Sequence, residues 1–358
     1  NALERGFGIT PHTDHFQAVL GIEAVLADGT LYRSPMALGG TAPCFKWGVG
    51  PYLDGLFSQS GLGVVTNMSI ALVKRPQVVQ PFYFWVDSAA QLPAVLDGVK
   101  RILDRCGSQV GGINLMNSTR LLGMAYDARP LTQLNQAERD TAARSLALPA
   151  WMGVGSIYCE QAQLASLKGI IRTELRRFSS RYLFRSQRQL AWASQALRLL
   201  PGAWSRRWRV MLDKLHLGME LMEGRPNQVA LPLAYVAGAR PQAGALLDPA
   251  RDNCGLIWYA PILPLRSQQV ATFVRHMEHV CQTHRLPCPV TLTTLSGRAI
   301  DCTLPLLFDR NDEKATARAE DCYRDLFNSG KQQGVLPYRL PLAFMHLLTD
   351  TQAPAWQL

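Results

Sequence analysis

Gly55-Leu-Phe-Ser-Gln-Ser-Gly-Leu-Gly-Val-Val-Thr66 decides the fold of this 358-residue chain, together with Glu4-Arg-Gly-Phe-Gly-Ile-Thr-Pro-His-Thr-Asp-His-Phe16. Both stretches place glycine at short intervals. Glycine has no side chain, so its backbone N–H can approach a phosphate or a ring edge directly. Most glycine-rich stretches are turns, however. The pattern leaves two interpretations open: a pair of ordinary turns, or backbone that lies against a bulky anionic ligand.

The two stretches resemble the flavin-binding half of the vanillyl-alcohol oxidase and 4-cresol dehydrogenase (p-cresol methylhydroxylase) family. Phe45-Lys-Trp-Gly-Val-Gly-Pro51 and Met68-Ser-Ile-Ala-Leu-Val-Lys-Arg-Pro76 match the same family. The similarity runs, with gaps, from Asn1 to about Ala343. It implies an α+β fold: a PCMH-type FAD-binding domain, incomplete in this chain, and an α+β cap domain with an antiparallel sheet covered by helices.

The resemblance also implies a division into three parts. Residues 1–76 would be the second part of the FAD-binding domain, 77–330 the cap or substrate domain, and 331–358 a segment that returns to the FAD domain. The family's pyrophosphate loop would precede Asn1, and its closing segment would follow Leu358. We therefore expect the sequence to be a fragment of a longer protein.

Local patterns predict several elements. Alternation on both sides of Asp28-Gly29 indicates a hairpin with a two-residue turn. Ser88 is expected to cap a helix that ends at Gly107. Further strands are expected at 64–73, 81–86, 154–159, 256–260 and 302–308, and helices after 160 and around 270–280.

Tyr338 and Arg339 are the expected catalytic pair. A phenol can donate to the oxygen of a bound phenolate while a neighbouring guanidinium neutralises its charge. The alternative is a pair that only packs the two domains together. In the family, the matching residues follow the strand that corresponds to Leu256–Pro261 and bind the 4-hydroxyl of the substrate. Ionising a para-phenol eases hydride loss from the benzylic carbon to the flavin, so the cofactor carries the redox step.

The resemblance further implies residues that contact FAD. They are Asn1, Glu4, Arg5, Gly6, Gly8, Ile9, Gly63, Val64, Val65 and Thr66. The family attaches its flavin through a histidine or a tyrosine, and here those positions fall at Leu256 and near Asp248. Neither side chain can form the family's bond, so we expect non-covalent FAD, with a thioether to Cys254 as the alternative.

The histidines are expected to have structural roles rather than catalytic or metal-binding ones. Asp14 and His15, with His12, could form a catalytic dyad, but structural hydrogen bonding is the preferred interpretation. His276 and His279 share one helix without a third ligand, so no metal site is expected. Where the family carries two substrate-side histidines, this chain has Ser296-Gly-Arg-Ala-Ile300. A simple 4-alkylphenol is therefore only one candidate substrate.

The chain carries a formal net charge of +10, and many of its arginines fall between Arg172 and Arg209. Several of them recur at helical spacing, which predicts either a solvated basic helix face or a surface that docks a membrane or an acidic partner. The residues show no nucleic-acid-binding signature, so that partner is set aside. Eight scattered cysteines without a C-x-x-C pair favour a reducing, cytoplasmic compartment over the periplasm.

These observations predict an FAD-dependent oxidoreductase that oxidises a small para-hydroxylated aromatic, with O2 or a cytochrome as electron acceptor and a homo-oligomeric assembly. Two alternatives stay open. One keeps the flavin and changes the substrate to a larger alcohol or a biosynthetic intermediate. The other is a flavin-free relative that serves as a binding subunit through its basic face.

Overall fold

The computed structural model describes residues 2–11, 14–37, 43–125, 129–185, 195 and 216–348. Asn1, His12 and the basic residues at 186–194 and 196–215 lie outside that description. The strands are β1 (Val19–Leu26), β2 (Leu31–Arg33), β3 (Gly63–Ile70), β4 (Val78–Val86), β5 (Asn114–Asn117), β6 (Trp151–Cys159), β7 (Arg181–Phe184), β8 (Cys254–Tyr259), β9 (Pro261–Pro264), β10 (Thr291–Thr294), β11 (Ala299–Asp309) and β12 (Leu336–Pro337). The α-helices are α1 (Leu92–Cys106), α2 (Ser118–Ala125), α3 (Gln136–Ser145), α4 (Leu164–Leu175), α7 (Ser267–Thr283) and α8 (Glu313–Gln332), and the 3-10 turn η7 spans Leu231–Tyr235.

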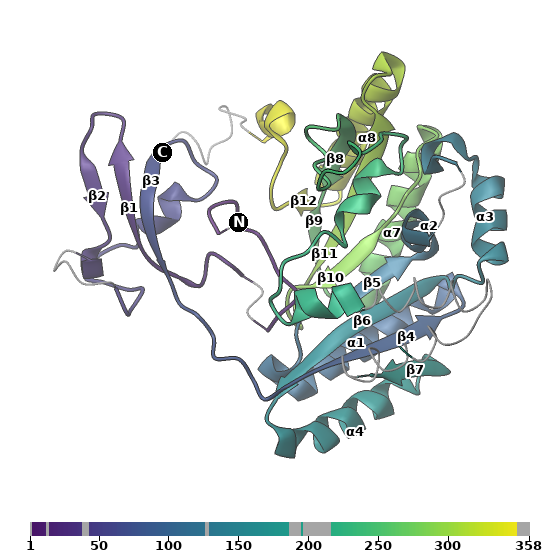
Figure 1. Ribbon diagram of the computed structural model, residues 1–358, viewed down its shortest axis with the longest axis horizontal. Coiled ribbons are helices and arrows are strands. Elements are labelled where there is room, and N and C mark those ends of the chain that lie inside the picture. Colours follow the sequence, from purple (N-terminus) through teal and green to yellow (C-terminus); the bar gives the residue numbers. More distant parts are fainter. Residues whose placement is uncertain are drawn as a thin grey trace.

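The strands form two sheets that lie apart in space (Figure 1). The larger sheet has nine strands in the order β12-β9-β11-β10-β5-β6-β4-β7, with β8 added to the far half of β11. Its pairings are antiparallel. The smaller sheet has the order β2-β1-β3. The chain is therefore a mixed α+β protein, as the sequence predicted.

Helices α1, α4, α7 and α8 pack against one face of the nine-stranded sheet and bury the main core. The α1 helix contributes Val95, Val99 and Ile102, which recur at helical spacing as predicted. Two glycines of β6 make room for aromatic rings of β4. A Cβ added to Gly153 would stand 1.9 Å from the Phe84 ring, so this strand cannot carry a larger residue there.

Two details of the predicted elements were wrong. The hairpin at Asp28-Gly29 has a three-residue loop, because Leu26 pairs with Thr30 and Gly29 adopts a left-handed conformation at φ +84°. Ser88 forms no side-chain cap, since a 3-10 turn at Ala89–Gln91 precedes α1. The predicted end of α1 at Gly107 is confirmed, with φ +55°.

The basic region is also not one continuous helix. The helix α4 ends at Leu175, and Arg181 lies on the edge strand β7. The reason is local. The Phe178 ring is buried against α1, in the space that a Cβ on Gly98 would fill, so the chain leaves the helix and turns back toward the sheet. Within the described part of the chain, no helix is both long and apolar enough to cross a membrane.

Candidate functional site

The face of the nine-stranded sheet that the four helices leave open carries a row of side chains with different chemistry. Alternation along β11 puts Ile300 and Cys302 in the helix-side core, so Asp301 and Thr303 belong to the opposite face. The register extends the same row through the sheet. Successive partners are Tyr83, Val154, Asn114, Thr293, Asp301 and Ile262.

The amino-terminal segment crosses this open face. Ile9 packs with Tyr83, Val154 and Met222 in a small apolar cluster. A Cβ added to Gly111 would stand 2.3 Å from the Ile9 carbonyl oxygen, so only glycine lets the segment pass there. Ile9, expected beside the flavin ring, thus lies against the same sheet face as Asp301.

Tyr338 and Arg339 reach this region directly after β12. The Tyr338 N–H donates to the Ala260 carbonyl at 3.3 Å, and its ring meets Phe7 edge-on at 5.6 Å between centroids. The Arg339 guanidinium lies 5.3 Å from the Tyr338 ring centroid. Both side chains are partly buried, and Arg339 forms no ion pair with any residue that the structure describes.

Asp301 is the residue that sequence reasoning missed. Only 6% of it is exposed; Oδ2 accepts a hydrogen bond from Thr303 Oγ1 at 2.8 Å, while Oδ1 has no partner among the residues that the structure describes. Burial raises the pKa of the Asp301 carboxyl to about 6, although the Thr303 hydrogen bond and the charge of Arg339 oppose this. A buried carboxyl with a free oxygen and a pKa near neutrality can exchange a proton with a ligand.

The charges of Asp301 and Arg339 influence the protonation of Tyr338. Burial is the main cause of a raised Tyr338 pKa; Asp301 raises it further and Arg339 lowers it. Tyr338 therefore stays a phenol at neutral pH and can donate a hydrogen bond. The structure brings together a neutral donor, a cation and a proton-exchanging carboxyl, which is the set of groups that a phenol or phenolate needs.

Gln59 ties the two sheets together at this site. Its side-chain Nε2 donates to the carbonyl oxygens of Glu4 at 3.2 Å and Tyr338 at 3.3 Å, and its backbone N–H donates to Leu3 at 2.8 Å. Gln59 adopts a left-handed φ of +51°. Gln59 lies within the Gly55–Thr66 stretch, but the sequence alone predicts no role for it.

The other residues expected at the cofactor lie on the smaller sheet. Val64 is 71% exposed and Thr66 is exposed, whereas Val65 packs into the small core. A Cβ added to Gly63 would stand 2.7 Å from the Val25 carbonyl oxygen, so the pairing of β1 with β3 requires this glycine. At Gly8 an added Cβ would stand 2.7 Å from His15 Nε2, the far end of a side chain that would have to shift. Protein atoms therefore lie over both glycines, and at Gly63 the backbone contact explains the residue.

Glu4, Arg5 and Gly6 form the start of the same segment. Arg5 Nε donates to Ser58 Oγ at 2.8 Å, and the Gly6 carbonyl accepts the His15 N–H at 3.2 Å. Asp14 Oδ1 accepts the N–H groups of Phe16 and Gln17. These contacts fit the structural interpretation of Asp14 and His15.

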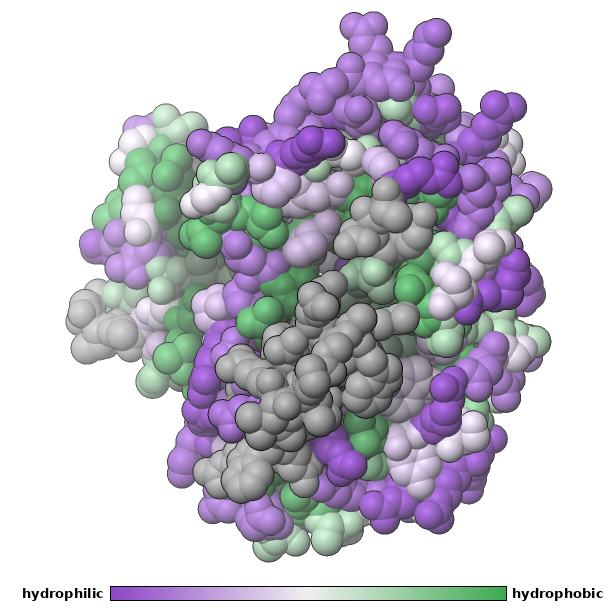
Figure 2. All heavy atoms as spheres, turned by 45° about the vertical axis from the view of Figure 1, so that its right-hand side comes forward, coloured by the Kyte–Doolittle hydropathy of each residue, from purple (hydrophilic) through white to green (hydrophobic). Residues whose placement is uncertain are grey.

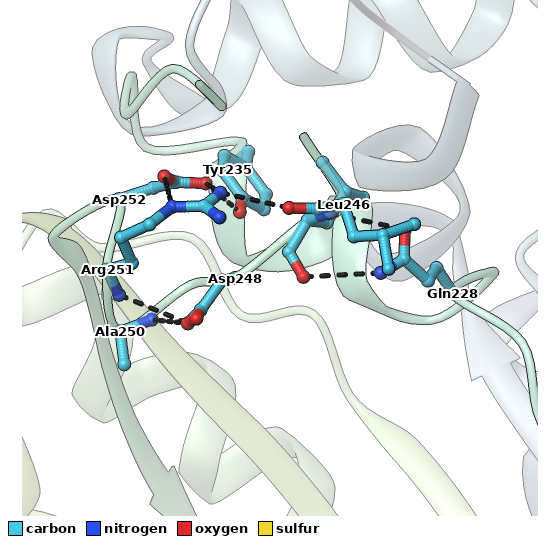
Figure 3. A network of polar contacts seen from close by, with 8 residues as sticks. Gln228, Tyr235, Leu246, Asp248, Ala250, Arg251 and Asp252 are labelled. Atoms are coloured by element: carbon cyan, nitrogen blue, oxygen red, sulfur yellow. Dashed lines mark hydrogen bonds and ion pairs between the residues drawn. The ribbon is translucent and has the colours of Figure 1, made fainter. Parts of the chain in front are cut away.

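The residues at the family's flavin-attachment positions have other contacts. Figure 3 shows the Asp248 carboxylate closing its own turn, with N–H donors from Ala250 and Arg251 at 3.1 Å each. Leu256 packs beside Leu307 in an apolar cluster. Burial raises the pKa of the Cys254 thiol, which is 8% exposed, so it stays protonated and poorly nucleophilic.

His276 of α7 and His284, which directly follows this helix, have protein partners. His276 Nε2 lies 2.8 Å from Ser329 Oγ, and His284 Nε2 lies 2.7 Å from Asp325 Oδ2. Across the residues that the structure describes, no group of three or more metal-ligating side chains is placed to hold an ion.

No protein-family profile matches the chain. Over 366 residues it is 31% identical to 1'-carboxy-chondrochloren decarboxylase of Chondromyces crocatus, covering 99% of this chain and 66% of that protein. Over 370 residues it is 24% identical to the 4-cresol dehydrogenase (hydroxylating) flavoprotein subunit of Pseudomonas putida, covering 99% of this chain and 63% of that protein. The chain thus spans just under two thirds of the length of these curated relatives.

Two solved structures share the fold. Substrate-bound p-cresol methylhydroxylase superposes with a TM-score of 0.77 at 22% identity, over 99% of this chain and 63% of that chain. The isoeugenol complex of 4-ethylphenol oxidase from Gulosibacter chungangensis superposes with a TM-score of 0.78 at 22% identity, over 96% of this chain and 62% of that chain.

Proposed function

We propose that this chain, which belongs to the p-cresol methylhydroxylase-like family of FAD oxidoreductases, supplies the substrate site of a flavoenzyme that oxidises a para-hydroxylated aromatic. The observation that carries the proposal is the convergence of Tyr338, Arg339 and Asp301 at the open sheet face. Two curated or structural relatives act on 4-alkylphenols by name, which supports this substrate class.

The residues present fit a flavin between the two sheets. Asp301 Oδ1 lacks a partner among the described residues, and Ile9 lies on the same face. Figure 2 shows apolar side chains, in green, gathered at the left on the three-stranded sheet. The exposed Val64 and Thr66 would contact the cofactor there, and the segment Glu4 to Ile9 would contact it on the other side, with Gly63 and Val65 supporting the contact surface. When bound, FAD would accept the hydride from the benzylic carbon.

The chain's own groups would handle the phenolic end of the substrate. Tyr338 donates a hydrogen bond to the phenolic oxygen, and Arg339 offsets the negative charge that forms on it. Asp301 accepts the phenolic proton, because a carboxyl with a pKa of about 6 is ionised at neutral pH and remains basic enough to hold a proton. The balance is a two-electron oxidation: one proton leaves the oxygen and one hydride leaves the carbon.

A second substrate class is favoured by one specific observation. The relative with 31% identity is named as a decarboxylase of a carboxylated molecule, and the family's two substrate-side histidines are absent here. The same pocket would then take a larger phenolic acid. The benzylic carbon would lose its hydride to FAD, and the adjacent carbon would lose CO2 in place of a proton, so that the electrons of the broken C–C bond form a new C=C bond and two electrons still reach the flavin. The phenol-binding roles of Tyr338 and Arg339 would not change.

Anaerobic reduction of the flavin in the full-length protein distinguishes these reactions. Bleaching of the flavin absorbance by 4-ethylphenol or 4-hydroxybenzyl alcohol supports the first substrate class. Bleaching only by a 4-hydroxyphenyl carboxylic acid, with release of one CO2 per flavin, supports the second. A full-length protein that purifies without flavin and cannot be reconstituted would favour the flavin-free binding subunit.

The electron acceptor, the mode of flavin binding and the protein partners complete the proposal. We expect O2 or a cytochrome as acceptor, non-covalent FAD and a homo-oligomer. In the described part of the basic region, the exposed Arg172 lies over the Phe184 ring, as does the half-buried Lys168, which precedes the region. The exposed Arg176 donates to the Tyr182 hydroxyl at 3.0 Å. Exposed cations on an aromatic surface suit an acidic protein partner or an anionic membrane surface.

A further inference from the structure

A cavity of about 480 Å³ lies between α3, α7, α8 and the end of β11. Its volume is in the range of small-molecule sites. Leu134, Ala237, Leu286, Leu307 and Phe308 give it a buried apolar floor. Leu307 is six positions after Asp301 on β11, about 20 Å along an extended strand. The cavity is therefore separate from the proposed phenol site.

Three arginines line this cavity: Arg139, Arg285 and Arg318. Arg139 is only 6% exposed. It donates to the Leu134 carbonyl and to Gln136 Oε1, but its Nε meets no acceptor in the described part of the chain. Within the part of the chain that the structure describes, none of the three forms an ion pair. Asp140 and Glu138 contribute favourable charge at Arg139, but a buried guanidinium without a direct ion pair remains costly, so a ligand anion placed against it would bind favourably.

The acidic residues of the cavity already serve other groups. Asp312 Oδ1 accepts the N–H groups of Lys314 and Ala315 at the start of α8, at 2.9 and 3.2 Å. Asp309 Oδ1 accepts from the backbone and the side chain of Asn311. One oxygen of each carboxylate thus caps a turn, and among the described residues neither carboxylate forms an ion pair with the three arginines.

We propose that this cavity binds a small organic anion, a carboxylate or a phosphate monoester with an apolar body. The anionic group meets Arg139, Arg285 and Arg318, which offer planar, forked donors for an oxyanion. The apolar body lies on the floor formed by Leu286, Leu307 and Phe308. The proposal is independent of the function proposed for Tyr338 and Arg339.

Hexanoate, hexyl phosphate and inorganic phosphate test the site by calorimetric titration of the full-length protein at constant ionic strength. The variant is Arg285→Gln/Arg318→Gln, at two exposed positions. Its matched control is Arg275→Gln/Arg310→Gln, which removes two exposed arginines outside the cavity. Melting curves without ligand check that both variants fold.

We expect saturable binding of hexanoate or hexyl phosphate to the wild type, weaker binding of inorganic phosphate, and a Kd at least about tenfold higher in the cavity variant but not in the control. The stronger of the two hexyl probes identifies the anionic group. Absence of saturable binding by all three probes overturns the proposal, as does an equal loss of affinity in both variants.

Discussion

The Asp301 carboxylate accepts a hydrogen bond from Thr303 Oγ1 at 2.8 Å through one oxygen, and its other oxygen has no partner within the described ranges of the chain. The two residues are neighbours on the open face of β11, and Asp301 lies within the electrostatic reach of Tyr338 and Arg339. This buried carboxyl makes the site sensitive to pH, and the first two predictions follow from it.

Asp301→Asn is expected to change how stability depends on pH. The pKa of Asp301 is raised from 3.8 to about 6 in the folded protein, so the folded state binds the proton more tightly than the unfolded state. This group therefore stabilises the fold below pH 4, and its contribution is lost as the pH rises to about 6. The loss is about 3 kcal/mol. Urea unfolding of wild type and variant between pH 4 and 7.5 should show it, and parallel curves would contradict it.

The rate of flavin reduction by a phenol should rise with pH through a pKa near 6, because only ionised Asp301 accepts the phenolic proton. Asp301→Asn should lose this limb and reduce the rate by about 100-fold or more. Thr303→Val is the matched control, because it removes only the hydrogen bond to Oδ2. Since that hydrogen bond lowers the pKa of Asp301, its loss should move the rise of the rate to higher pH without abolishing it. A wild-type profile without the limb would remove Asp301 from the proposed proton transfer.

Glu174→Gln should destabilise the fold by about 2 kcal/mol, because it removes the charge that accepts hydrogen bonds from arginines that are themselves partly exposed. Glu174 is 2% exposed and pairs with Arg101 at 2.8 Å, Arg105 at 2.9 Å and Arg177 at 3.5 Å. Hydrogen bonding from Arg101 is the first cause of its lowered pKa, so the stabilisation is present above about pH 4.5 and is lost on acidification through the lowered pKa. Glu160→Gln, at an exposed glutamate, is the control. Equal unfolding midpoints for the two variants would contradict the prediction.

The full-length protein should release its flavin on acid precipitation. Asp248 closes its own turn, Leu256 is apolar, and burial keeps Cys254 protonated. Flavin in the supernatant is the expected result. Flavin that stays on the precipitated chain and persists in Cys254→Ser would point to attachment through a residue outside the chain described here.

Much of the fold could be predicted because its strands and helices carry strong apolar periodicity. The helix-side core residues Val95, Val99 and Ile102 are an example. The basic region was harder, since the arginines continue at helical spacing beyond Leu175 while the burial of Phe178 ends the helix. The hairpin loop also depended on a left-handed Gly29, which a sequence pattern does not distinguish from a two-residue turn.

The site could be predicted only in part. Tyr338 and Arg339 came from a family resemblance, and their roles remain proposals. Asp301 was missed because the interpretation ended at Ile300, yet Asp301 and Thr303 are the polar residues that alternate with Ile300, Cys302 and Leu304. Gln59 was missed because its role depends on two carbonyl groups, those of Glu4 and Tyr338, which meet only in the folded chain.

Stopped-flow reduction of the flavin by a 4-alkylphenol, in wild type and Arg339→Ala with a melting curve of each sample, tests the central claim most directly. If Tyr338 and Arg339 bind and ionise a phenol, Arg339→Ala should slow reduction by about 30- to 1000-fold at unchanged melting temperature. Arg339→Lys should recover part of the rate, and Tyr338→Phe should be milder. An Arg339→Ala protein that melts lower but reduces its flavin at the wild-type rate would contradict the claim and leave the pair a packing role.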